Sequence, residues 1–278
     1  PIDHPMQVKP ISVEAHLGNI YDNPVLIAAR PEYLANLEAL PEIEKQRNLY
    51  GSWTARPEGA GYWRRAWVEE LTHYVRERGT KTVRSFDFAG SLKSDLYPYP
   101  DYTASVRMNK SPDGEYIIDD IRRTRIRYGD WEQFVLDCAR HDPPNTEYLI
   151  PVDPNPMAAR ATDEFVKRLR QKHRLTVRKM KTNGSKLDRF RPFSSATQNG
   201  QVKVLKDCGI DFENDISNSN DFFYKELEQF DGNKRNGENG KDDLVDSCSD
   251  AFYILASERT SFTGLGGGLK EMGRTIGV

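Results

Sequence analysis

The stretch KTVRSFDFAGS, residues 81–91, decides the fold class of this chain. Its β-branched and aromatic residues alternate with other residues and then stop at the small residues AGS, a pattern typical of a strand that ends in a turn. Asp87 stands at the end of this predicted strand, and it is the first of three acidic positions that the sequence context singles out.

Further strands are expected on both sides of a turn that follows. DYTASVRMN (101–109) and GEYIIDDIRRTRIR (114–127) have strand composition, and the turn SPDG (111–114) joins them. Such a pair is the signature of an antiparallel hairpin. Three more short strands are expected at TEYLIPVD (146–153), RLTVRKM (174–180) and QVKVL (201–205).

Helical patterns alternate with these strands. In GYWRRAWVEELTHYVRER (61–78), Trp63, Trp67, Leu71 and Tyr74 recur at helical spacing, which predicts an amphipathic helix. Other helices are expected within 130–141, 158–171, 185–200, 221–230 and 242–257. The order of elements predicts an α/β fold, in which helices flank both faces of a mixed sheet that contains an antiparallel hairpin.

Composition excludes several classes of protein. The chain of 278 residues is 37% hydrophobic, which is typical of a globular protein, and no apolar run approaches the roughly 18 residues of a membrane-spanning helix. We therefore expect a cytosolic protein. Cys138, Cys208 and Cys248 are odd in number and lack paired spacing, so neither a disulfide framework nor a zinc site is expected. The phosphate-binding pattern GxxxxGK[ST] is absent, so ATP hydrolysis by this chain is not expected.

The formal net charge of −2 hides two segments of opposite sign. Residues 160–191 carry twelve Lys or Arg against three acids, whereas residues 207–250 carry thirteen acids against four Lys or Arg. This segregation suits a protein that holds a polyanion beside a cation site. Two solvated helix faces would give the same pattern, and charge alone does not separate the two explanations.

Three acidic sites at element ends suggest a metal centre. Asp87 and Asp153 each end a predicted strand, and Asp243 and Asp246 lie on one face of the helix that starts in KDDLVDSCSDA. Gathered carboxylates raise one another's pKa unless a cation neutralises them, and oxygen ligands favour Mg²⁺ or Mn²⁺. Any one of these aspartates alone is better explained as a turn former or a helix cap, and the combination is what favours a metal site. The sequence leaves open whether Asp242 or Asp243 faces the metal.

The ordered motifs resemble the nuclease domain of large terminase subunits of tailed bacteriophages. They are FDFAGS (86–91), DYTASV (101–106), IPVDPNP (150–156), GSKLDRFRPFSSATQNGQVKV (184–204) and KDDLVDSCSDAF (241–252), and the upstream EYLANLEALPEIEKQRNLYGSW (32–53) resembles the segment that leaves the ATPase domain of that family. The closing motif is also similar to one in RuvC-type resolvases.

The resemblance implies a ribonuclease H-like fold and an endonuclease that cuts concatemeric double-stranded DNA with two Mg²⁺ or Mn²⁺ ions. It implies that Asp87, Asp153 and Asp243 are catalytic and bind the metals, and that Asp246 assists. The chain departs from the family pattern at Lys241, where a histidine is common, and at Ser247, where an alanine is usual. Lys241 leaves histidine-assisted proton transfer in doubt and would instead place a cation near the phosphate.

Basic residues on two segments are the candidates for DNA contact. Phosphate contacts need positive charge without base-reading geometry, which suits cutting with little sequence preference. Lys186 matches a lysine in the corresponding loop of the family. The DNA-binding candidates are Arg122, Arg123 and Arg125 on the second strand of the hairpin, and Lys179, Lys181, Lys186 and Arg189 around KMKTNGSK.

The resemblance also implies an organisation and a set of partners. Residues 1–58 are expected to lead in from an upstream ATPase domain, 59–257 to form the nuclease domain, and 258–278 to form a flexible glycine-rich tail. Double-stranded DNA, a small terminase subunit and a portal protein are the expected partners, without a membrane, in the cytoplasm of an infected bacterial host. Two alternatives stay open: a RuvC-type junction resolvase or transposase-like nuclease, and a non-catalytic DNA-binding or portal-docking module.

Overall fold

The computed structural model describes residues 20–40, 44–51, 61–152, 155–181, 184–233, 237 and 240–257. Within these residues nine strands form one mixed sheet, in which seven follow the order β1-β7-β4-β3-β2-β5-β6, while β8 pairs with β4 and with β9. The strands are β1 (Glu69–Leu71), β2 (Lys81–Asp87), β3 (Thr103–Lys110), β4 (Tyr116–Thr124), β5 (Glu147–Pro151), β6 (Thr176–Met180), β7 (Val202–Leu205), β8 (Gly209–Asp211) and β9 (Ile216–Ser217).

The centre of the sheet is the part that the sequence predicted. Strand β3 runs antiparallel to both β2 and β4, with Asp87 opposite Ala104 and Ala104 opposite Arg123. Strands β5 and β6 continue the sheet parallel to β2. The predicted antiparallel hairpin and the mixed sheet are therefore confirmed.

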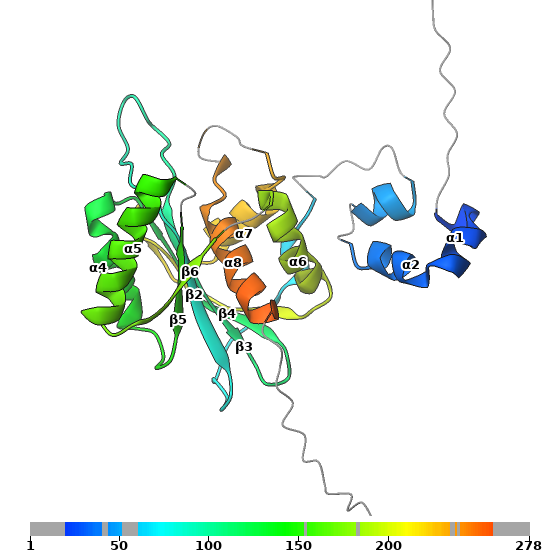
Figure 1. Ribbon diagram of the computed structural model, residues 1–278, viewed down its shortest axis with the longest axis horizontal. Helices are drawn as coiled ribbons and strands as arrows, with labels where there is room; N and C mark the ends of the chain where they lie inside the picture. The colour runs from blue at the N-terminus through cyan, green and yellow to red at the C-terminus, as the bar shows by residue number, and fades with distance from the viewer. Residues whose placement is uncertain are drawn as a thin grey trace, which may run out of the picture.

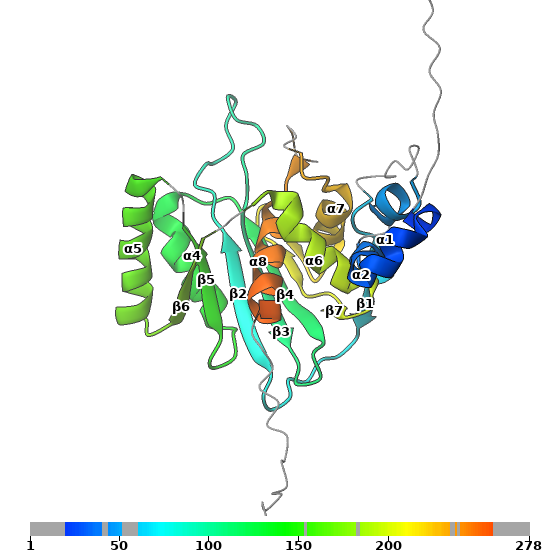
Figure 2. The ribbon, with the colours of Figure 1, turned by 45° about the vertical axis from the view of Figure 1, so that its right-hand side comes forward.

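Helices cover both faces of the sheet (Figures 1 and 2). On one face lie α4 (Trp131–Ala139), which follows the short η4 (Tyr128–Asp130), and α5 (Pro156–Gln171). On the other lie α6 (Lys186–Gln198), α7 (Asp221–Gln229) and α8 (Asp243–Ser257). Two apolar clusters fill the two interfaces. The side chains of β2 point into these clusters on opposite faces of the sheet: Val83 packs in the cluster with α8, and Phe86 packs in the cluster with α4 and α5.

A buried ion-pair network lies beneath α4. Arg84 of β2 is fully buried, and its guanidinium donates to Asp142 Oδ2 at 2.7 Å and Oδ1 at 2.6 Å. Asp120 of β4 lies 2.9 Å from the same guanidinium, and this charge helps hold Asp120 ionised with a pKa lowered to about 2, despite burial. The network links strands β2 and β4 to Asp142, which follows the end of α4.

The predicted helix over 61–78 is wrong. This segment contains only the 3-10 turn η3 (Arg65–Trp67) before strand β1, which pairs in parallel with β7. Trp63 is 1% exposed and stacks on Tyr224 of α7, with ring centroids 5.7 Å apart. The conformation of 61–78 is therefore set by contacts with β7 and α7, which come much later in the chain, and not by the helical spacing of its aromatic residues.

The structure also differs from the sequence prediction in the Asn-rich region before α7, where it contains two strands, β8 and β9. An added Cβ at Gly209 would stand 2.2 Å from Ser219 O, so the backbone approach between these segments requires a glycine. The small hairpin extends the sheet beside β4.

The N-terminal region is helical. It contains η1 (Ile20–Asp22), α1 (Pro24–Ala29), α2 (Pro31–Glu38) and the π-helical turn η2 (Lys45–Leu49). These helices lie beside α6 in Figure 2, where Glu44 Oε1 accepts from Arg191 Nε at 2.7 Å and Ala39 O from Ser195 Oγ at 2.6 Å. The expected tail, 258–278, lies outside the described residues. Among the helices described, none has the length and apolar character to cross a membrane.

Candidate active site

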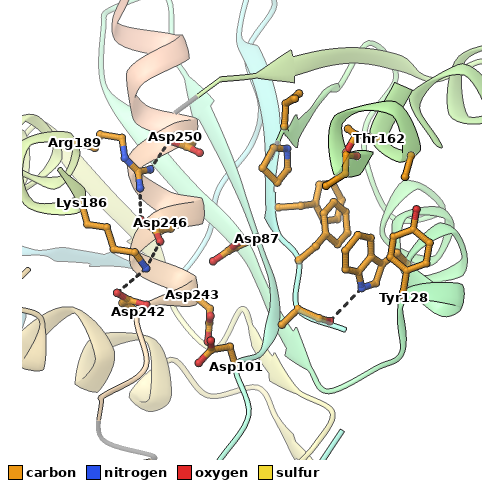
Figure 3. Close-up of a pocket in the computed structure, with 18 residues that line it drawn as sticks. Asp87, Asp101, Tyr128, Thr162, Lys186, Arg189, Asp242, Asp243, Asp246 and Asp250 are labelled. Atoms are coloured by element: carbon orange, nitrogen blue, oxygen red, sulfur yellow. Dashed lines mark hydrogen bonds and ion pairs between the residues drawn. The ribbon is translucent and has the colours of Figure 1, made fainter. Parts of the chain in front are cut away.

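A cavity of about 480 Å³ opens where β2 ends, between the helices of the two faces (Figure 3). Its two sides differ in chemistry. The acidic wall carries Asp87 of β2, Asp242, and Asp243, Asp246 and Asp250 of α8, together with the cations Lys186 and Arg189 of α6. The opposite side is the aromatic wall, formed by Phe88, Tyr128 and Trp131.

Asp87 points from the central strand towards α8 (Figure 3). Side chains alternate across a sheet, so Asp87 shares the face of Val83, which packs in the α8 cluster. Burial, followed by the charges of Asp243 and Asp246, raises the pKa of Asp87 well above its ordinary value. No hydrogen bond or ion pair joins this carboxylate to any other residue that the structure describes. It is therefore an oxygen donor without a hydrogen-bond or ion-pair partner in the described part of the chain.

Asp243 is fixed at the first turn of α8. Its Oδ2 accepts from the backbone N–H of Tyr102 at 2.9 Å, and the side chain is nearly buried. Burial, with Asp101 and Asp242 nearby, raises its pKa to about 7 even though the Tyr102 hydrogen bond lowers it. The start of α8 is held by Glu226 of α7, whose Oε1 accepts from Leu244 N at 2.6 Å and Val245 N at 3.3 Å.

Two cations from α6 neutralise the other carboxylates of the acidic wall. Lys186 Nζ lies 2.7 Å from both Asp242 Oδ2 and Asp246 Oδ2. Arg189 donates to Asp246 Oδ1 at 2.8 Å and to Asp250 Oδ1 at 3.0 Å. Burial lowers the pKa of Lys186, but the carboxylates of Asp246 and Asp242 outweigh this and raise it above its ordinary value.

The donor set fits hard divalent cations. The acidic wall presents carboxylate oxygens, which are the ligands that Mg²⁺ and Mn²⁺ prefer, and it contains no His or Cys. Among the described residues, no three acidic, His or Cys side chains are already close enough to hold a metal ion. This agrees with the ion pairs, since Lys186 stands between Asp242 and Asp246. A cation bound at Asp246 has to compete with this ammonium.

Three of the four proposed metal ligands line the same cavity, and the fourth lies outside the described residues. Asp87, Asp243 and Asp246 surround one cavity, as the sequence analysis expected, and Asp242 lines it too. Asp153 lies outside the described residues, although its neighbour Val152 lines the same cavity.

The structure separates the DNA-binding candidates into two groups. Lys186 and Arg189 line the cavity, Lys181 is exposed, and Lys179 is exposed beside Asp163, 2.9 Å away. Arg122, Arg123 and Arg125 form the second group, which does not line the cavity.

The three arginines of β4 and its continuation point into the domain. Arg122 makes two hydrogen bonds to Asp120, at 2.8 Å and 2.9 Å, and is 6% exposed. Arg123 donates to Asp211 at 2.8 Å and packs on the ring of Tyr102. Arg125, 7% exposed, donates to Pro100 O at 3.0 Å. Because these guanidinium groups are occupied within the domain, they are not available as a DNA-binding surface.

Several cavity residues were missed by the sequence analysis. Asp101 and Asp250 both line the cavity, and their only sequence signal was membership of the motifs 101–106 and 241–252. Lys241 does not reach towards the α8 carboxylates, because its Nζ donates to Tyr99 O and Asp101 Oδ1, both at 2.6 Å. This lysine fixes the end of the loop between β2 and β3, which rises at the top of Figure 1.

The aromatic wall is rigidly stacked. Trp131 Nε1 donates to Ala89 O at 3.1 Å, and the Trp131 ring stacks on Phe88 with centroids 4.7 Å apart. Phe88 in turn stacks on Phe86 at 5.3 Å. Tyr128 packs on the other side of Trp131 at 4.6 Å and is 52% exposed. The cavity thus has a fixed apolar surface facing its carboxylates.

Comparison with known protein families identifies one family. The model of the family described as "Terminase RNaseH-like domain" matches residues 84–254, more than half of the chain, including Asp87, Asp243 and Asp246. Two solved structures show 14% identity and a TM-score of 0.45. The human cytomegalovirus terminase nuclease domain, Mn soaked and inhibitor bound, covers 63% of this chain and 82% of its own; the large terminase nuclease from thermophilic phage G20c, with bound magnesium, covers 70% and 95%. No curated protein matches significantly.

Proposed function

Because the chain belongs to the family of terminase RNase H-like domains, we propose that it is the endonuclease of a phage DNA-packaging motor. Its substrate is concatemeric double-stranded DNA, and the reaction is phosphodiester hydrolysis assisted by two Mg²⁺ or Mn²⁺ ions. The sheet, with its antiparallel β2–β3–β4 centre and its flanking helices, is the ribonuclease H-like fold of this family.

The convergence of Asp87, Asp243 and Asp246 on one cavity is the observation that carries this proposal. They come from the central strand and from the last described helix, so the fold has brought together acids from opposite ends of the domain. Burial and mutual repulsion raise the pKa values of Asp87 and Asp243, so the ionised site is costly without a cation. Structural roles such as capping do not require this clustering.

Asp87, Asp153 and Asp243 would hold the ions, with Asp246 assisting. Divalent ions bound there supply an activated water and stabilise the leaving oxygen of the phosphodiester. Asp87 offers a carboxylate that is unpaired within the described chain, and the Tyr102 N–H holds Asp243 in a fixed orientation. Val152 at the cavity supports a place for Asp153 beside the other two.

Lys186 and Arg189 would hold the DNA phosphate at the cavity. Lys186 would leave its ion pairs with Asp242 and Asp246 if bound ions neutralised these carboxylates, and its ammonium would then pair with a phosphate oxygen. Lys179 and Lys181 lie on the exposed end of β6 and after it, and would extend this contact along the DNA backbone.

The boundaries and partners follow from the same proposal. Residues 59–257 would form the nuclease unit, since Trp63 already packs in its core, and residues 1–58 would lead in from an ATPase domain. The small terminase subunit and the portal protein would be its partners in the packaging motor, in the cytoplasm of the infected bacterial host.

Cleavage of plasmid DNA tests the proposal. Incubation with Mn²⁺ or Mg²⁺ is expected to convert supercoiled plasmid to linear and shorter products, and EDTA is expected to stop the reaction. Asp87→Asn should abolish cleavage because it removes the central carboxylate while retaining the shape of the side chain. Asp113→Asn, at the exposed turn of the β3–β4 hairpin, is the matched control and should cut normally.

Three outcomes contradict the proposal. Equal cutting by Asp87→Asn would mean that another nuclease or another site is responsible. A clear preference for four-way junctions over linear duplex would favour a resolvase. Failure to cut, combined with the absence of Asp87-dependent Mn²⁺ binding in calorimetry, would favour a non-catalytic DNA-binding module.

A further inference from the structure

The nuclease chemistry leaves the aromatic wall of the cavity unexplained. A phosphodiester and its metal ions need oxygen ligands and positive charge, which the acidic wall and α6 supply. They need no apolar surface. Yet Tyr128 and Trp131 line the same cavity as Asp87. Figure 3 shows Tyr128 on the side of the cavity opposite the α8 carboxylates.

The aromatic wall is built as a stacking surface. The rings of Phe86 and Phe88 are 3° from parallel, and those of Phe88 and Trp131 are 23° from parallel. Phe134 and Phe165 support this stack edge-on, and Trp131 is fixed by its hydrogen bond to Ala89 O. The inner rings are therefore held in place by the core below them. Such a surface is preorganised, so a planar ligand would lose little free energy in ordering it.

Tyr128 is the accessible ring at the end of this stack, and its plane is tilted 56° from that of Trp131. It is 52% exposed, although it packs on Trp131 at a centroid distance of 4.6 Å. A tyrosine whose role was core packing alone would be expected to turn more of its ring away from solvent. Its exposure leaves an aromatic face available at the cavity.

The size of the cavity restricts its occupant. About 480 Å³ lies within the range of sites for a single small ligand, roughly 300–1,000 Å³, and a duplex can rest only at its mouth. In an intact duplex the bases are stacked on one another and hidden from such a surface. A base reaches an aromatic side chain in a cavity of this kind after it leaves the stack.

We propose that Tyr128 and Trp131 hold an unstacked nucleobase beside the phosphodiester that the acidic wall cuts. This inference rests on the proposed nuclease function and specifies its substrate: DNA that is locally opened at the point of cleavage. Lys186 and Arg189 contact the phosphate on one side of the cavity, and the aromatic wall receives the base on the other. Stacking is tolerant of sequence because every base has an aromatic face.

Equilibrium binding to two DNA molecules tests the inference. One is a fully paired fluorescent duplex, and the other is identical except for a two-base mismatched bubble at its centre. Fluorescence anisotropy is measured with Ca²⁺ in place of Mg²⁺, and denaturing gels verify that the strands stay intact. The wild-type chain is expected to bind the bubble more tightly than the duplex. Tyr128→Ala should weaken binding to the bubble by roughly 5- to 150-fold, the usual effect of losing one base–aromatic stack, and leave duplex binding unchanged.

Two further variants serve as controls. Tyr128→Phe retains the ring and should bind like wild type. Tyr97→Ala removes a tyrosine that is 69% exposed in the loop between β2 and β3 but does not line the cavity, and it should also bind like wild type. Thermal unfolding of each variant checks that the fold is retained.

Equal affinity of the wild-type chain for bubble and duplex would overturn the inference. So would an equal loss of affinity for both DNAs in Tyr128→Ala, because that result indicates packing on the sugar or on the outside of the duplex. Loss of the Tyr128 effect with cleavage intact overturns this inference alone. Absence of metal-dependent cleavage with the Tyr128 effect intact overturns the proposed function, and of this inference only the binding of an unstacked base at the aromatic wall then stands.

Discussion

Replacing Asp243 by asparagine is expected to stabilise the metal-free protein at alkaline pH while removing its function. The buried carboxylate has its pKa raised from 3.8 to about 7, by burial and by the charges of Asp101 and Asp242. A carboxyl whose folded pKa exceeds its unfolded pKa contributes stability at low pH, and this contribution is lost as the pH rises through the folded value. The loss occurs between about pH 4 and pH 7.

The size of the effect follows from the same shift. The difference between 3.8 and about 7, at about 1.4 kcal/mol for each pKa unit, corresponds to about 4 kcal/mol. Asparagine has the same shape and its amide oxygen can still accept from Tyr102 N, so the substitution removes the charge and keeps the contact that orients the side chain. We therefore expect Asp243→Asn to exceed the wild type in free energy of unfolding by up to about 4 kcal/mol at pH 8.

Urea denaturation with EDTA at pH 5 and pH 8 measures this difference. The wild type should lose stability between the two pH values, and Asp243→Asn should lose less. Adding Mn²⁺ at pH 8 should stabilise the wild type, by about 2.7 kcal/mol when the ion is at one hundred times its dissociation constant, and leave the variant nearly unchanged. Asp113→Asn, exposed at a turn, controls for the loss of one acidic charge. If Asp243→Asn is no more stable than the wild type at pH 8 without metal, the electrostatic reasoning fails.

Two other substitutions probe the supports of the site. Arg84→Ala should reduce the free energy of unfolding by about 3–5 kcal/mol in urea denaturation, because it leaves the buried Asp142 carboxylate short of a partner; a loss below about 1 kcal/mol would refute this role. Burial raises the pKa of Glu226 to about 8, so Glu226→Gln, which mimics the neutral acid, should retain stability at pH 7. Glu226→Ala should cost about 1–3 kcal/mol by leaving the N–H groups of Leu244 and Val245 unpaired, and equal stability of the two variants would contradict the capping role.

The central strands were predictable because their neighbours impose a local pattern. Successive side chains of β2 point to opposite faces of the sheet, and each face packs in its own apolar cluster, so the residue pattern of 81–87 predicts a strand. Strand β1 has no such residue pattern. It is three residues long, lies at the edge of the sheet, and is held in its conformation by pairing with β7, far along the chain. The aromatic residues of 61–78 that imitate a helix are instead anchored by partners such as Tyr224.

The same distinction applies to the site. Acids at the ends of predicted elements can be picked out one by one, and Asp87, Asp243 and Asp246 do lie around one cavity. Pairing between distant residues leaves no comparable signal. The sequence shows Arg123 as one of several basic residues, whereas its partner Asp211 belongs to a strand that the sequence analysis did not predict. The place of Tyr128 at the cavity also left no signal in the sequence, since the acidic wall opposite it comes from β2 and α8.

Strand β1 also decides how far the chain can be trimmed. A fragment that begins at Thr80, just before β2, would still contain the whole span matched by the family, but it would lack the strand that covers the outer edge of β7. Uncovered strand edges recruit strands from neighbouring molecules. Such a fragment is expected to aggregate during expression, whereas one that retains Trp63 and β1 keeps both the shielded edge and a buried aromatic anchor.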